Sequence, residues 1–178
     1  MYQTVLDFWF QEIEPSQRWK KDLAFDQLIK KRFAHLHLRA VSGELFEWRH
    51  NAKGRLAEII ILDQFSRNMY RDTKLAFTSD SQALTLSQEA VSAKVNKVLS
   101  PIENSFLYMP YMHSESLAIH DIALNLFKKN GIESNYKFEV KHKEIIEMFG
   151  RYPHRNKILG RVSTPEEIEF LKGPGSSF

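Results

Sequence analysis

The densest group of residues able to do chemistry lies near the carboxyl end of the chain, in the segment 149–156. It reads Phe-Gly-Arg-Tyr-Pro-His-Arg-Asn and combines two guanidinium groups, an imidazole and an amide. Gly150 is placed to end a helix, and Pro153 fixes its own φ at about −65° and restricts the residue before it. The polar side chains are therefore held at a rigid bend, which suits an anionic ligand but equally suits a structural corner.

Two upstream segments carry the same mixture of polar groups. Residues 62–71 read Leu-Asp-Gln-Phe-Ser-Arg-Asn-Met-Tyr-Arg, and residues 111–115 read Tyr-Met-His-Ser-Glu. At 100° per residue, the polar side chains of the first segment fall within an arc of about 140°, on a helix whose preceding residues 56–62 are apolar nearly all round. An unpaired buried polar group costs roughly 1–3 kcal/mol, so this arc must face other polar groups or a wet pocket. We therefore predict that the three segments line one cleft.

Arginine dominates this predicted cleft, and its planar, permanently charged group suits forked contacts with carboxylate or phosphate. We accordingly predict a binding module for a small anionic ligand or an acidic peptide. The candidate ligand-binding residues are Asp63, Gln64, Arg67, Asn68, Arg71, His113, Glu115, His142, Arg151, His154, Arg155 and Asn156. The alternative is a structural network, in which the arginines pair internally with Asp63, Glu115, Glu144 or Glu147 and lock the order of the helices.

An enzyme is a second alternative for the same cleft. His113, Glu115 and His154 are candidate catalytic residues for a small hydrolase or lyase, because an imidazole and a carboxyl group can serve as general base and acid. The chain has neither a glycine-rich phosphate loop nor a serine at a nucleophile elbow. The histidines lack the spacing typical of a zinc helix, so we predict no metal site and no cofactor.

Size and composition set the remaining expectations. The chain has 178 residues, of which 43% are hydrophobic and 26% charged, which is ordinary for one globular domain. A net charge of +3 with scattered lysines does not predict a nucleic-acid surface. The sequence has no cysteine, no apolar run near the ~20 residues that span a bilayer, and no signal-peptide pattern at its start. We expect a soluble cytoplasmic protein with no membrane partner, and the oligomeric state stays open.

Apolar residues recur at helical spacing along most of the chain and predict an all-α fold of about eight helices. The clearest local signal is Ser-Pro-Ile-Glu at 100–103, a capping box with proline at the first helical position. Pro110 is expected to interrupt or kink the helix that follows, with a further helix starting near His113. We predict a single all-helical domain over residues 1–172 and a flexible tail over residues 173–178.

Several motifs also resemble a mainly bacterial family, domain-of-unknown-function family 924. They are the segments 5–10, 54–57, 62–68, 113–115, 142–146, 149–156 and 159–167, which cover nearly the whole chain in order. The resemblance implies a tetratricopeptide-like fold of stacked antiparallel helix pairs, and it implies no particular activity. Ser66 departs from the family pattern, which usually has proline after Asp-Gln-Phe.

Overall fold

The computed structural model describes residues 1–176, which form α-helices joined by short 3-10 and π-helical turns, with no strand in this range. The all-helical prediction is confirmed. The α-helices are α1 (Tyr2–Asp7), α2 (Leu23–Val41), α3 (Ala52–Ile60), α4 (Ser66–Met69), α5 (Asp80–Ser92), α6 (Pro101–Met112), α7 (Leu117–Asn130), α8 (Glu133–Phe149), α9 (Asn156–Leu159) and α10 (Pro165–Phe170).

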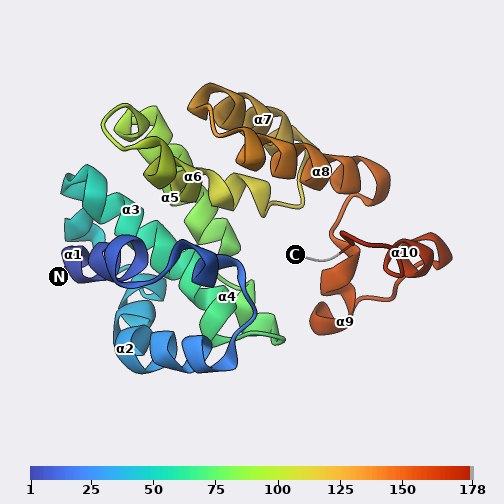
Figure 1. The fold of residues 1–178 in the computed structure, drawn as a ribbon, viewed down its shortest axis with the longest axis horizontal. Coiled ribbons are helices and arrows are strands. Elements are labelled where there is room, and N and C mark those ends of the chain that lie inside the picture. Colours follow the sequence, from blue (N-terminus) through green and yellow to red (C-terminus); the bar gives the residue numbers. More distant parts are fainter. Residues whose placement is uncertain (177–178) are drawn as a thin grey trace.

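The amino-terminal helices gather around α3, and the chain then continues as consecutive packed helices (Figure 1). α3 packs against α1, α5 and α6, and α7 packs against both α6 and α8. From the end of α8 the chain turns back, so that α9 lies across from α4 (Figure 1). The carboxyl-terminal segment therefore returns toward helices that come much earlier in the sequence.

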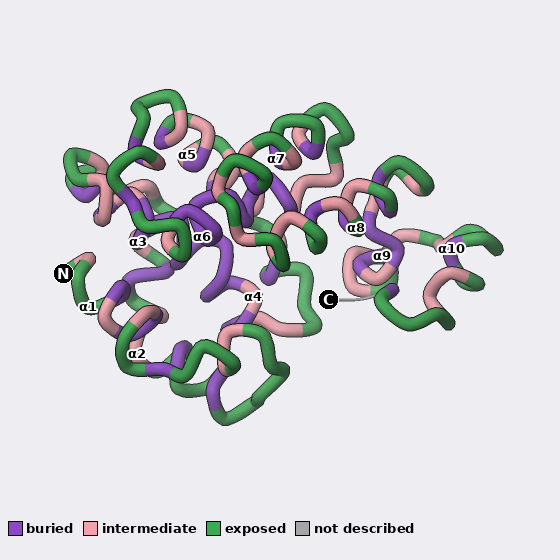
Figure 2. Tube along the Cα trace, turned by 45° about the horizontal axis from the view of Figure 1, so that its top comes forward, coloured by how far each residue is buried: buried purple, intermediate pink, exposed green. Residues whose placement is uncertain are grey.

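Aromatic side chains fill the main core. Phe33 has its ring centroid 5.0 Å from that of Phe8 and 4.9 Å from that of Phe65. Trp9 contacts Phe65 at 5.5 Å and Phe106 at 5.6 Å. The buried stretches run along α3 and α6 (Figure 2), as expected for helices enclosed by others. Each of these fully buried rings contributes on the order of 1.5–3 kcal/mol to folding.

A second, smaller core holds the carboxyl-terminal segment. Ile145, Ile146 and Tyr152 are buried together, and Phe149 and Phe170 pack against them. Gly150 separates α8 from this segment with a φ of +67°, a conformation that glycine adopts without strain. The predicted helix end at Gly150 is thus confirmed.

Pro110 does not interrupt α6, so the expected helix break at this proline is wrong. The helix runs from Pro101 to Met112, and Pro110 lies inside it. Proline removes a single N–H donor, and the nine buried residues of α6 hold the helix together around that gap. The chain bends only after Met112, so His113 lies at a corner between α6 and α7 and not inside a helix.

The division into a domain of residues 1–172 and a tail of residues 173–178 stays a prediction. Residues 173–176 form turns, and the Ser176 hydroxyl donates to the carbonyl oxygen of Leu171 at 3.2 Å. Residues 177–178 lie outside the described part of the chain.

Candidate functional site

A cavity of about 490 Å³ lies between three parts of the chain that are distant in sequence. Its walls come from the ranges 74–84 and 110–115, together with Arg155 and Leu159. The first range leads into α5, the second ends α6, and the last two residues come from the returning carboxyl-terminal segment. The fold therefore brings two of the three predicted segments, 111–115 and 149–156, to one cavity.

Arg155 is the most unusual residue of this cavity. Pro153 opens the 3-10 turn that carries it, and only 5% of the residue is exposed. The guanidinium lies 4.5 Å from the ring centroid of Tyr152 and 4.8 Å from that of Phe77. Its ion pair with Asp80 is long, at 3.5 Å, and its Nε is buried with no hydrogen-bond acceptor among the described residues.

The charge of Arg155 is therefore poorly compensated. Burial and the neighbouring positive charge of Arg67 lower the pKa of Arg155 to about 10, although Asp80 and Glu115 act in the opposite direction. The side chain still carries its charge near pH 7. A buried cation with an unused donor at a cavity wall is suited to receive an anion.

Arg67 presents the opposite case, because its charge is fully paired. Its two terminal nitrogens donate to the two carboxylate oxygens of Asp80, each at 2.9 Å. Nη1 also donates to the carbonyl oxygen of Asp63 at 3.0 Å and lies 3.2 Å from the carboxylate of the same residue. Burial would lower the pKa of Arg67, but Asp63 and Asp80 outweigh it and raise that pKa. Arg67 thus ties α4 to the start of α5.

Asp63 and His113 form a hydrogen-bonded pair at 2.7 Å, between Asp63 Oδ1 and His113 Nδ1. Asp63 lies in the π-helical turn Ile61–Phe65, and such turns inside α-helices frequently occur at functional sites. Burial would raise the pKa of the Asp63 carboxyl, but the charge of Arg67 and the hydrogen bonds from His113 and Gln64 outweigh it and hold that pKa well below its ordinary value. Asp63 is therefore an ionised acceptor.

The imidazole of His113 is neutral near pH 7, because burial and Arg67 lower its pKa more than Asp63 raises it. An ionised carboxylate only accepts hydrogen bonds, so Nδ1 must carry the ring proton. Nε2 then has a free lone pair. Since His113 lines the cavity, Nε2 is the atom that it offers to a bound molecule.

Glu115 has a structural environment. Arg161 donates to both of its carboxylate oxygens, at 2.6 and 2.9 Å, and the backbone N–H of Tyr152 donates at 2.7 Å. Burial would raise the pKa of Glu115, but these hydrogen bonds outweigh it and lower that pKa. A carboxylate held ionised in this way is poorly suited to the role of a general acid.

The other candidate histidines surround Tyr152, behind the cavity wall. The ring centroid of His154 lies 5.6 Å from that of Tyr152, and that of His142 lies 5.8 Å away. Burial, followed by Arg155, lowers the pKa of His154 to about 4. Burial also lowers the pKa of His142 to about 3, and its Nδ1 donates to the carbonyl oxygen of Phe138. Both rings are therefore neutral near pH 7, and neither lines the cavity.

Two of the predicted arginines lie elsewhere, so the prediction of one cleft for all candidates was too broad. Arg71 donates to Asp26 of α2 at 2.5 and 2.7 Å. Arg151 donates to Glu167 of α10 at 2.7 and 2.8 Å. Each guanidinium is paired with a carboxylate away from the cavity. This is internal pairing as in the structural alternative, although Asp26 and Glu167 are not the partners that it named.

The three predicted amide residues are also hydrogen-bonded to carboxylates within the protein. Asn68 donates to Asp26 at 2.8 Å, and Asn156 donates to Glu167 at 3.0 Å. Gln64 donates to Asp63 at 2.6 Å and supports that carboxylate from behind. Their polar side chains thus complete buried networks.

Sequence reasoning missed Lys74, Phe77 and Asp80, which line the cavity. It also missed Arg161, which pairs with Glu115. Asp80 carries the only local signal, since an acidic residue in the first turn of a helix is common for reasons of the helix dipole. That signal gives no hint of its two arginine partners.

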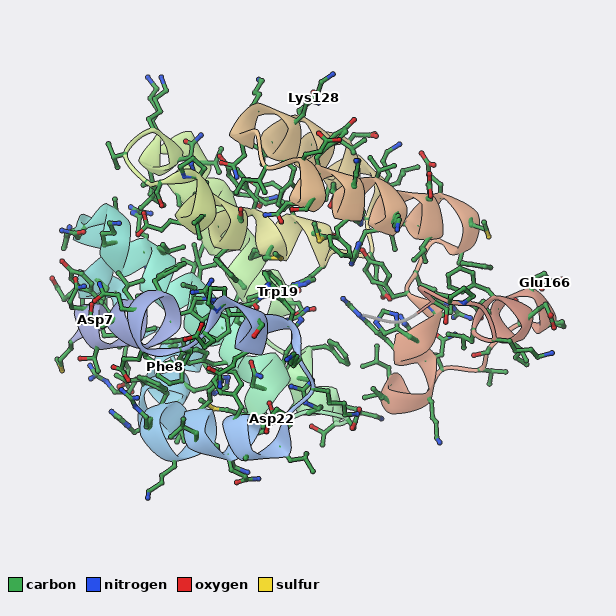
Figure 3. The ribbon with its side chains drawn as sticks, in the orientation of Figure 1. Asp7, Phe8, Trp19, Asp22, Lys128 and Glu166 are labelled. Carbon is green, nitrogen blue, oxygen red and sulfur yellow. The ribbon has the colours of Figure 1, made fainter. Side chains whose placement is uncertain are left out.

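Charged side chains on the outer faces of the carboxyl-terminal helices point into solvent. Figure 3 shows Lys128 on the outside of α7 and Glu166 at the far edge of α10. The neighbouring Glu167 is buried and binds Arg151. Adjacent acidic residues therefore have opposite roles, which helix periodicity imposes.

Two further properties concern the described residues 1–176 as a whole. None of their helices has both the length and the apolar character needed to pass through a lipid bilayer. Within the same range, no three histidine, aspartate or glutamate side chains are grouped in a way that would hold a metal ion.

Fold and site together define an all-helical protein with a buried arginine and an aspartate–histidine pair at one cavity. The chain belongs to the family of bacterial proteins of unknown function called DUF924, whose model matches residues 5–175. A solved structure of the protein of unknown function ATU0120 from Agrobacterium tumefaciens is similar, with 34% sequence identity, a TM-score of 0.92 and 97% of each chain covered. No protein with a curated function matches this chain.

Proposed function

We propose that the cavity binds a small molecule bearing a carboxylate or phosphate group, with Arg155 as its main contact. The observation that carries this proposal is the buried guanidinium of Arg155. Among residues 1–176, its Nε has no acceptor and its only carboxylate contact is 3.5 Å long. A charge that is costly to bury and poorly paired gains most from a ligand that brings the missing acceptors.

Lys74 supplies a second positive group at the same cavity. Its side chain reaches toward the returning segment, because Nζ lies 3.6 Å from the position that a Cβ on Gly160 would take. No ion pair of Lys74 is found among residues 1–176. A ligand between Lys74 and Arg155 would therefore meet positive charge from two sides.

The size of the cavity favours a small molecule over an acidic peptide. Its volume of about 490 Å³ falls within the range of roughly 300–1,000 Å³ that is typical of small-molecule sites. Arg155 is 5% exposed, so a ligand must enter the cavity to reach it. An extended peptide would contact the rim and leave the guanidinium unpaired.

A thermal-shift experiment tests this proposal, with phosphate, malonate, succinate and citrate as anionic probes and succinamide as the neutral control. A ligand at 100 times its dissociation constant stabilises a protein by about 2.7 kcal/mol. We expect at least one anion to raise the melting temperature of the wild type, and Arg155→Gln to abolish that shift. Equal shifts in both proteins would contradict the proposal.

Arg71→Gln is the matched control for this experiment. Arg71 is also a partly buried arginine on a carboxylate, but its partner Asp26 lies away from the cavity. We expect this variant to lower the melting temperature of the free protein while keeping the full shift caused by the anion.

The cellular location and the comparison with tetratricopeptide proteins remain proposals. We place the protein in the cytoplasm, in keeping with a sequence that has no cysteine. The packing of α7 between α6 and α8 supports a tetratricopeptide-like stack of helix pairs. Cell fractionation tests the first proposal, and superposition on tetratricopeptide structures tests the second.

A further inference from the structure

We infer that the cavity is a catalytic site in which His113 activates water to hydrolyse a small ester that carries a carboxylate or phosphate group. The inference rests on the proposed anion site, because Arg155 would hold the charged end of the substrate. It adds a reaction, a base and a substrate class to that site.

The pair formed by Asp63 and His113 has the geometry of an oriented general base. The carboxylate accepts from Nδ1 at 2.7 Å, which fixes both the tautomer and the orientation of the ring. It leaves the basic Nε2 for the cavity. A buried carboxylate that orients a neutral imidazole is the arrangement by which hydrolases prepare a general base, and the carboxylate also stabilises the imidazolium that forms.

The base, His113, and the anion-binding Arg155 are held at a fixed separation. Arg67 contacts Asp63 at 3.2 Å and Asp80 at 2.9 Å, and Arg155 contacts Asp80 at 3.5 Å. Together with the hydrogen bond between His113 and Asp63, these contacts join His113 to Arg155 through one continuous polar network. A substrate whose charge lies on Arg155 therefore presents the rest of its structure to the cavity that His113 lines.

The identity of the nucleophile follows from what surrounds the imidazole. Among residues 1–176, no serine or threonine hydroxyl is hydrogen-bonded to His113, and its side chain instead hydrogen-bonds Asp63. Water is then the nucleophile that the base can reach. The cavity is open to solvent, and 14% of the His113 side chain is exposed.

The reaction balances with water as the only co-reactant. Nε2 of His113 takes a proton from water as the water oxygen bonds to the carbonyl carbon of the ester. The bond from that carbon to the leaving oxygen then breaks, and the leaving oxygen takes the proton back from His113. One ester and one water give one carboxylic acid and one alcohol, and the imidazole is again neutral.

Mono-4-nitrophenyl succinate is a direct probe, because it carries both a free carboxylate and an ester, and 4-nitrophenyl acetate is its counterpart without the charge. We expect saturable hydrolysis of the succinate ester by the wild type and a kcat lower by about 10²–10⁴-fold in His113→Asn. Arg155→Gln should raise KM for the succinate ester at least about ten-fold, with little effect on the acetate ester.

His35→Asn is the matched control, because His35 is exposed on α2 and surface imidazoles hydrolyse nitrophenyl esters slowly without any site. This variant should keep the wild-type kcat and KM. If His113→Asn and His35→Asn have the same rates, or if the wild-type rate does not saturate, the inference is wrong.

Asp63 acts through His113, so Asp63→Asn tests a positioning role. We expect a lower kcat with an unchanged KM, and a changed acid limb in the pH dependence of kcat. A loss of helical circular dichroism in this variant would instead report a folding defect. In that case the wild-type profile decides: kcat/KM must fall on acidification as one group is protonated, and a profile that stays flat down to the pH at which the protein unfolds would overturn the inference.

Calorimetric titration of succinate separates a failure of this inference from a failure of the proposed function. If succinate binds the wild type and His113→Asn equally but the succinate ester is not hydrolysed, the cavity is a binding site and the catalytic inference fails alone. If succinate and phosphate bind neither protein, the anion site itself is refuted.

Discussion

Arg155 and Arg67 lie at the same cavity but should respond in opposite ways to replacement by methionine. Burial lowers the pKa of Arg155 from its ordinary value to about 10, so the fold disfavours its charged form. Since a ten-fold change in an equilibrium constant is about 1.4 kcal/mol, the charge costs roughly 3 kcal/mol at pH 7. The contacts of the guanidinium with the rings of Tyr152 and Phe77 stabilise the folded protein by on the order of 1–2 kcal/mol.

We therefore expect Arg155→Met to stabilise the protein by about 1 kcal/mol, because methionine keeps the apolar stem between the two rings and removes the charge. For a domain of this size, that gain corresponds to a melting temperature higher by about 2–4 °C. Arg67→Met should instead destabilise by about 3–5 kcal/mol, because it leaves the buried Asp63 and the partly buried Asp80 without their main cation.

Urea denaturation at pH 7, followed by circular dichroism, measures both changes in the free energy of unfolding. Arg71→Met is a useful third variant, because it breaks a paired arginine outside the cavity and should destabilise as Arg67→Met does. If Arg155→Met proves as destabilising as Arg67→Met, then Arg155 is a structural residue. The argument for a ligand would lose its main support.

Two further predictions concern the core. His142 and His154 have pKa values of about 3 and 4 in the folded protein, below the 6.5 of an unfolded histidine, chiefly because of burial. Because the folded protein keeps both rings neutral, it is most stable above pH 6.5, and this stability is lost as pH falls toward 4. At pH 5, each histidine should lower the free energy of unfolding by about 2 kcal/mol relative to pH 7. His142→Leu should therefore reduce the fall in unfolding free energy measured between pH 7 and pH 5. An unchanged pH dependence in that variant would contradict the reasoning. Gly54→Ala should destabilise by about 3 kcal/mol, because a Cβ there would lie 2.2 Å from the carbonyl oxygen of Trp48, and an unchanged urea midpoint would show that α3 moves away without cost.

The helices could be predicted because their signals are local. Ser100 and Glu103 form the predicted capping box, in which the Glu103 carboxylate accepts from the Ser100 N–H at 2.9 Å and the Ser100 hydroxyl accepts from the Glu103 N–H at 3.3 Å. The prediction that Pro110 would interrupt the helix was wrong for a non-local reason. The loss of one backbone hydrogen bond is a local cost, whereas the burial of α6 by its neighbours is a tertiary gain that outweighs it.

The candidate site shows the same division. The sequence marked Asp63, Arg67, His113 and Arg155 as polar residues that need partners inside a largely apolar protein. It did not distinguish them from Arg71 and Arg151, because all these arginines have the same chemistry and similar surroundings in sequence.

By itself, then, the sequence determined where the helices lie, which faces are apolar and which polar residues need partners, since these depend on neighbours within a few positions along the chain. Only the tertiary structure decided which carboxylate each arginine meets. Arg71 binds Asp26, which is 45 positions away in the sequence, and Arg155 contacts Asp80, which is 75 positions away. Such pairings depend on which helices pack together in the folded protein. The packing of the carboxyl-terminal segment leaves Arg155 poorly paired at the cavity that His113 also lines.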